Sequence, residues 1–183
     1  MLSERAQQIP PFLVMEILEK AKSLERDGVD IIHLEIGEPD FPTPLKIRQA
    51  AIEALEQGKT HYTHSLGILP LRVAIADHYR KKYNVAVSPE QIIVTLGTSP
   101  ALLLVLSALL NPGDEVILPD PCYACYPNFV RYVNGKVISM PVHAEEGFVF
   151  QPERIENKVT SRTKAIMINS PSNPTGAVFN AAT

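Results

Sequence analysis

The chain has 183 residues, of which 45% are hydrophobic and 20% are charged, and its formal net charge is -3. This is the composition of a soluble globular protein that is long enough for one substantial core, or for one domain and part of another. A weakly acidic balance without a run of lysine or arginine offers no electrostatic surface for nucleic acid or an anionic membrane, so neither is expected as a partner.

The N-terminus carries an acid at Glu4 and no apolar stretch of the signal-peptide type, and two cysteines are too few for a disulfide framework. We therefore expect a cytoplasmic protein. The most apolar window, residues 102–110, is roughly half of the ~20 residues that a membrane span needs, so it indicates a buried helix.

The first part of the chain predicts helices and one strand. Apolar residues at helical spacing predict a helix that ends at Gly28, and residues 31–36 predict a strand. Thr43 and Pro44 suit the cap and the first position of a second helix, which is expected to end at Gly58. A third amphipathic helix is expected around residues 71–79.

From there on, strands and helices alternate. Strands are expected at residues 92–95, 115–118, 136–140 and 165–168, with helices from about residue 100 and about residue 123. Such alternation implies crossover connections. The predicted fold class is therefore α/β, a three-layer α/β/α architecture with a mostly parallel sheet.

A turn-rich loop, Asn-Ser-Pro-Ser-Asn-Pro-Thr-Gly at residues 169–176, follows the last predicted strand. Open α/β sheets hold their ligands at the carboxyl ends of strands. An asparagine before proline, such as Asn173, is more often a plain turn residue, and the bond between Asn173 and Pro174 is a candidate for the cis form.

A second loop, Gly97-Thr98-Ser99, lies between a predicted strand and an apolar helix. Free amides and the helix dipole favour an anion such as phosphate there. The plainer interpretation is a tight turn at Gly97 with Thr98 or Ser99 as an N-cap.

In their order and spacing, these two loops and the segment Pro-Asp-Pro-Cys-Tyr-Ala-Cys-Tyr at residues 119–126 resemble the fold-type I pyridoxal-phosphate-dependent aminotransferases of the aspartate aminotransferase superfamily. The resemblance runs from about Leu34 to the last residue. It implies pyridoxal 5'-phosphate as cofactor, an amino acid and a 2-oxo acid as substrates, and a homodimer or larger assembly. It also implies that residues 1–43 belong to a small domain and residues 44–183 to the first part of the cofactor-binding large domain.

The resemblance assigns roles residue by residue. Residues 97–99 would meet the cofactor phosphate, Tyr123 would stack on the pyridine ring, and the Asn173 amide would donate to the ring oxygen. Tyr62 would reach the cofactor phosphate of a partner subunit, and the Gly37 backbone would meet the substrate carboxylate. Without the resemblance, Tyr123 is an ordinary helix-start tyrosine, Gly37 a strand-ending turn and Tyr62 a half-buried aromatic.

In the family, the Schiff-base lysine and the partner residues of the cofactor ring and the substrate carboxylate follow the Asn-Pro-Thr-Gly motif. No residue of these 183 is therefore assigned a catalytic role, and the chain is expected to be the inactive N-terminal part of such an enzyme. Related carbon–sulfur lyases share this fold. The alternative from another class is a catalytically silent fragment that associates with a partner.

Two other motifs suggest different chemistry. Cys122 and Cys125 have metal or redox spacing, and His61 with His64 could complete a zinc site, although the two pairs lie far apart in sequence. The spacing of Ser161 and Lys164 fits some acyl-transfer enzymes, but it precedes a strand and has no companion motif, so Lys164 receives no catalytic role.

Overall fold

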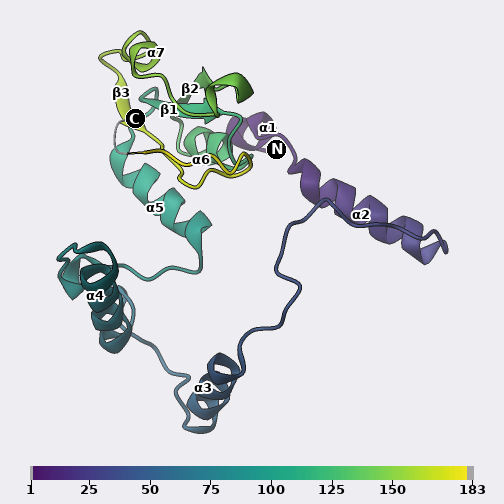
Figure 1. The fold of residues 1–183 in the computed structure, drawn as a ribbon, viewed down its shortest axis with the longest axis vertical. Helices are drawn as coiled ribbons and strands as arrows, with labels where there is room; N and C mark the ends of the chain where they lie inside the picture. The colour runs from purple at the N-terminus through teal and green to yellow at the C-terminus, as the bar shows by residue number, and fades with distance from the viewer. Residues whose placement is uncertain (1, 181–183) are drawn as a thin grey trace. The chain divides into compact units, whose positions relative to one another are not determined.

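The computed structural model describes residues 2–180, which fall into two compact units. The sheet unit comprises the chain up to Glu35 together with the chain from Ser99 on, and the helical unit comprises Ile36–Thr98. Figure 1 follows the chain through both units from the purple N-terminus to the yellow C-terminus.

Three parallel strands form the sheet unit's centre: β1 (Glu115–Asp120), β2 (Lys136–Pro141) and β3 (Thr163–Ile166). Their order is β2-β1-β3, so β1 lies in the middle (Figure 1). Ile117 is paired with Ile138 on one side and with Ile166 on the other. The parallel sheet confirms the predicted α/β class.

Helical segments cover both faces of the sheet. Successive side chains of a strand point to opposite faces, and apolar side chains on each face pack against helices. One face packs under α5 (Thr98–Leu109) and α6 (Tyr126–Tyr132), in a buried cluster of Leu106, Leu110, Val116, Leu118 and Val130. The other face holds Ile117, Met140, Val142 and Phe150, with Ile155 of α7 (Pro152–Glu156) packed against them. This arrangement agrees with the predicted three layers.

A buried carboxylate fastens the amino ends of the strands. Glu115 accepts hydrogen bonds from Thr160 Oγ1 at 2.7 Å and Lys136 Nζ at 3.0 Å. The hydrogen bond from Thr160, and then the one from Lys136, hold the pKa of Glu115 below its usual value of 4.5. Gly113, with φ +84°, provides the tight turn that delivers the chain into β1.

The N-terminal part of the sheet unit is helical. Helix α2 (Leu13–Arg26) is followed by Gly28 at φ +85°, as predicted. A short helix that the sequence did not indicate, α1 (Glu4–Gln8), precedes it. Arg5 ties α1 to α6, since its guanidinium lies 5.7 Å from the centroid of the Tyr132 ring and Nη1 donates to the Tyr132 carbonyl.

The helical unit contains α3 (Leu45–Glu56), α4 (Leu69–Tyr83) and the 3-10 helix η1 (Pro89–Gln91). Both predicted α-helices are present, and Gly58 at φ +67° follows α3. The predicted start of α3 is off by one residue, because Pro44 is the N-cap and Thr43 lies outside the helix. In the part of the chain that the structure describes, no helix has the length and apolarity to cross a membrane.

Two predicted strands are wrong. Neither residues 31–36 nor residues 92–95 form a strand, although both are rich in β-branched residues. A strand needs a neighbouring strand to pair with. In residues 92–95, the Ile92 amide donates to the Pro89 carbonyl at 3.3 Å and the Val94 amide donates to the Leu66 carbonyl at 2.9 Å, and these two bonds do not form a ladder along a second strand. In residues 31–36 it is the His33 ring that bonds, to Glu25 and Glu35.

Several boundaries also differ from the prediction, among them the ends of β1 and β2, which lie two residues and one residue later than predicted. Helix α6 begins at Tyr126 instead of about residue 123, since residues 123–126 form a turn closed by the bond from the Tyr126 amide to the Tyr123 carbonyl. Strand β3 begins and ends two residues early. Helix α5 starts at Thr98 instead of about residue 100.

Candidate functional site

Two of the predicted site residues lie on loops that leave the same edge of the sheet. Tyr123 lies in the turn after β1, and Asn173 lies in the loop after β3. Because β1 and β3 are neighbouring parallel strands, their carboxyl ends face one way. That edge is where α/β sheets hold small-molecule ligands.

Tyr123 presents a partly buried aromatic surface. Its ring centroid lies 6.3 Å from that of Phe12 and 5.4 Å from that of Tyr126, and both pairs are edge-to-face. A hydrogen bond with the Cys125 side chain, and then burial, raise the pKa of Tyr123 above 10.0. The phenol is therefore neutral at pH 7. A neutral phenol ring suits stacking against another ring, and Tyr123 does not act as a phenolate at this pH.

The Asn173 loop is held by its own hydrogen bonds. The backbone amide of Asn173 donates to Asn169 Oδ1 at 2.9 Å, and the backbone amide of Gly176 donates to the Ser172 carbonyl at 2.7 Å. The peptide bond between Asn173 and Pro174 is cis, which confirms that prediction. The Asn173 side chain is exposed and stands on a preformed turn.

Backbone amides in the first turn of an α-helix have no acceptor within the helix, and in α5 this turn begins at Thr98. Thr98 and Ser99 are its first residues, and Gly97 before them has no side chain that could cap the helix. Gly97 has φ +89°, and its carbonyl accepts from Thr95 Oγ1 at 2.6 Å. The N-cap role considered for Thr98 and Ser99 is therefore wrong, because both lie within the helix. Gly97 and Thr98 belong to the helical unit and Ser99 to the sheet unit.

The two remaining candidates lie in the helical unit. Tyr62 is fully exposed, not half-buried, and lines a pocket of about 400 Å³ with Thr60, His61 and Thr63. Gly37 is also exposed, and a Cβ added there would meet no atom within 4 Å. The structure thus gives no steric reason for a glycine at this position.

The two cysteines are free and partly buried. Burial, and then the nearby Asp120 carboxylate, raise the pKa of the Cys122 thiol above 9.0. Zinc binding and disulfide exchange both use the thiolate, which this environment disfavours. Within residues 2–180, no three potential metal-ligating side chains come together.

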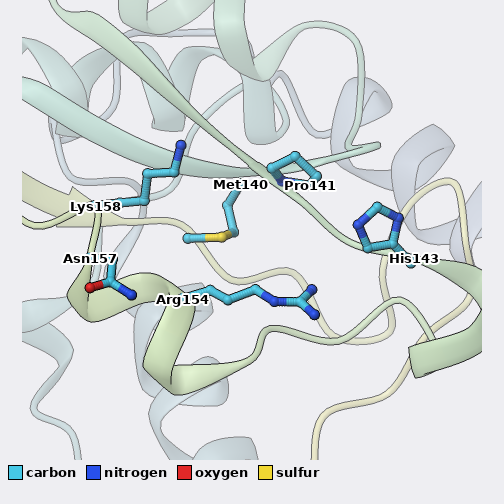
Figure 2. Close-up of a pocket in the computed structure, with 6 residues that line it drawn as sticks. All are labelled: Met140, Pro141, His143, Arg154, Asn157 and Lys158. Atoms are coloured by element: carbon cyan, nitrogen blue, oxygen red, sulfur yellow. The ribbon is translucent and has the colours of Figure 1, made fainter.

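A pocket of about 320 Å³ in the sheet unit is lined by Met140, Pro141, His143, Arg154, Asn157 and Lys158 (Figure 2). No motif in the sequence indicated it, and none of the predicted site residues lines it. Arg154 already donates two hydrogen bonds to the Glu146 carboxylate, from Nη1 at 2.7 Å and Nη2 at 2.5 Å. Its charge is thus neutralised by the protein itself.

Residues 29–183 match the family of class I and II aminotransferases. The chain belongs to this family. The aspartate/prephenate aminotransferase of Thermus thermophilus is 46% identical over 178 residues, which cover 97% of this chain and 46% of that protein. The (5-formylfuran-3-yl)methyl phosphate transaminase of Methanocaldococcus jannaschii is 47% identical over 180 residues, which cover 98% of this chain and 46% of that protein.

Solved aminotransferase structures share the fold. The aspartate aminotransferase from Thermus thermophilus with maleate aligns with a TM-score of 0.95 at 45% identity, over 100% of this chain and 48% of that chain. The alanine aminotransferase from Pyrococcus furiosus aligns with a TM-score of 0.93 at 34% identity, over 100% of this chain and 47% of that chain. The chain thus spans about half the length of the aminotransferases that it matches.

Proposed function

We propose that this chain forms the N-terminal part of a pyridoxal-phosphate-dependent aminotransferase that moves an amino group between an amino acid and a 2-oxo acid in the cytoplasm. The observation that carries the proposal is the placement of Tyr123 and Asn173 on loops at one edge of a parallel sheet, in a chain of the aminotransferase family.

The residues present fit the cofactor's chemistry. The amides and hydroxyls of Thr98 and Ser99, after Gly97, would hold the phosphate at a helix N-terminus. Tyr123 would cover the pyridine ring. The side-chain amide of Asn173 would donate to the ring oxygen and stabilise its anionic form. When bound, pyridoxal phosphate supplies the electron sink for proton transfer at the substrate α-carbon.

Two further residues would bind groups other than the cofactor of their own subunit. The Gly37 backbone would bind the substrate carboxylate, and Tyr62 would bind the cofactor phosphate of a partner subunit. The lysine that links to the cofactor and moves the substrate proton would lie outside the 183 residues. Within such an enzyme, residues 1–43 would contribute to a small domain and residues 44–183 would begin the large one.

An amino-group transfer assay tests the proposal. The protein isolated from its source, loaded with pyridoxal phosphate, should convert 2-oxoglutarate to glutamate with at least one donor from a panel that includes aspartate and alanine. The panel must be broad, since relatives at 34–47% identity carry the names of different substrates. Thiol release from sulfur-containing amino acids without transfer would indicate a carbon–sulfur lyase, and inactivity with every donor would favour a silent fragment.

The 183-residue chain is also expected to associate into a dimer or larger assembly. Helix α5 exposes a row of large apolar side chains: Leu104 at 57%, Val105 at 52% and Leu109 at 53%. Such exposed apolar surface favours association. Light scattering coupled to size exclusion at micromolar concentration should give a mass of at least twice 20.2 kDa. A monodisperse monomer that unfolds cooperatively would contradict this expectation.

A further inference from the structure

Arg72, in the first turns of α4, is a charged side chain buried within the helical unit. Its residue exposure is 3%, whereas Arg80 on the same helix has a side chain that is 65% exposed and pairs with Asp77. Burying a guanidinium is costly unless its donors are satisfied. The hydrogen-bond partners of the Arg72 guanidinium therefore indicate its structural role.

The guanidinium of Arg72 joins two segments on either side of α4 in the sequence. Its Nε donates to the Gly67 carbonyl at 3.1 Å, and its Nη1 donates to the Pro89 carbonyl at 2.8 Å. The Glu90 carboxylate lies 3.3 Å from the same Nη1. The planar fork thus holds the loop that precedes α4 against η1.

A second contact extends this link to residues 92–95. The Val94 amide donates to the Leu66 carbonyl at 2.9 Å. Gly67, with φ +99°, packs so closely on Val94 that an added Cβ would lie 2.7 Å from Val94 Cγ2. Only glycine fits here without a shift. The loop at residues 64–67 thus packs against residues 92–95, which follow η1 in the chain.

Both joined segments continue into residues of the proposed site. The loop is preceded by Tyr62, and Val94 is followed shortly by Gly97 and Thr98, all within the helical unit. We propose that Arg72 is a positioning residue that holds the segment bearing Tyr62 against the segment bearing Gly97 and Thr98. It would thereby link a phosphate site of its own subunit to the residue offered to the partner's cofactor. This inference rests on the proposed function.

The first test measures the positioning itself in the 183-residue chain, by hydrogen exchange at the Val94 and Gly67 amides. Arg72→Met should speed exchange there by about tenfold or more, the fold-change of one lost charge-assisted hydrogen bond. Arg72→Lys, which retains the charge but has no fork, should recover part of the protection and serves if the methionine variant fails to fold. Arg80→Met is the control and should leave both amides unchanged.

The second test measures phosphate recognition in the protein isolated from its source, as the ratio of its affinities for pyridoxal phosphate and pyridoxal. Arg72→Lys should lower this ratio several-fold, and Arg80→Lys should not. If the unsubstituted protein shows no preference for pyridoxal phosphate, the proposed function fails, and this inference with it. If the preference exists but Arg72→Lys leaves it unchanged, or if exchange at Val94 does not respond to Arg72→Met, the positioning role is wrong and the proposed function stands.

Discussion

Replacing Ile117 with alanine is expected to lower the free energy of unfolding of the 183-residue chain by about 2–5 kcal/mol. Ile117 is 0% exposed at the centre of the middle strand, where it packs with Met140, Val142 and Phe150. Truncation would remove buried apolar surface and leave a cavity in the cluster that Ile117 forms with these three residues. Urea denaturation followed by circular dichroism measures the change.

Ile166 offers a matched control on the neighbouring strand. It is the same residue type and pairs with Ile117 in the sheet register, but it is 40% exposed. Ile166→Ala should therefore cost less than half as much as Ile117→Ala. Equal losses for the two variants would mean that Ile117 does not lie in a better-packed environment than its neighbour, which would contradict the described core.

In the cofactor-loaded protein isolated from its source, Asn173→Ala is expected to raise the pKa read from the absorbance of the bound cofactor. In the proposed site, the substitution would remove a donor to the anionic ring oxygen, worth roughly 1.5–3 kcal/mol, or about one to two pKa units. Folding should change little, because the Asn173 contact that orders the loop comes from its backbone amide. A spectroscopic pH titration measures the shift.

Asn157→Ala is the control for that titration. The Asn157 side chain donates to the Glu153 carbonyl at 3.0 Å near the end of α7, so its loss should leave the cofactor's pKa unchanged. An unchanged pKa in Asn173→Ala, with cofactor still bound, would remove Asn173 from the site.

The sequence predicts elements well where local and tertiary signals agree. Residues 115–118 and 136–140 combine β-branched runs with turn residues, and each has a strand beside it in the structure. Residues 31–36 and 92–95 carry the same local signal, yet neither forms a strand. Pairing is a tertiary property that periodicity does not encode.

The candidate site divides in the same way. Tyr123 and Asn173 are predicted from the resemblance to a family, which is carried by turn-rich segments after strands and can therefore be read from local sequence. Arg72 and Gly67 are not found, since an arginine in an amphipathic helix usually indicates a solvated face. The signal that identifies Arg72 is its burial together with acceptors at Gly67 and Pro89, which only the folded chain brings within reach.

We propose that this chain supplies the phosphate-, ring- and oxygen-binding residues of an aminotransferase whose cofactor-linking lysine lies outside these 183 residues. Borohydride reduction of the cofactor-loaded protein from its source, followed by peptide mass mapping, tests it most directly. We predict one phosphopyridoxyl group per polypeptide, on a lysine outside the 183 residues. Stoichiometric labelling of a lysine within them, Lys164 included, would contradict it.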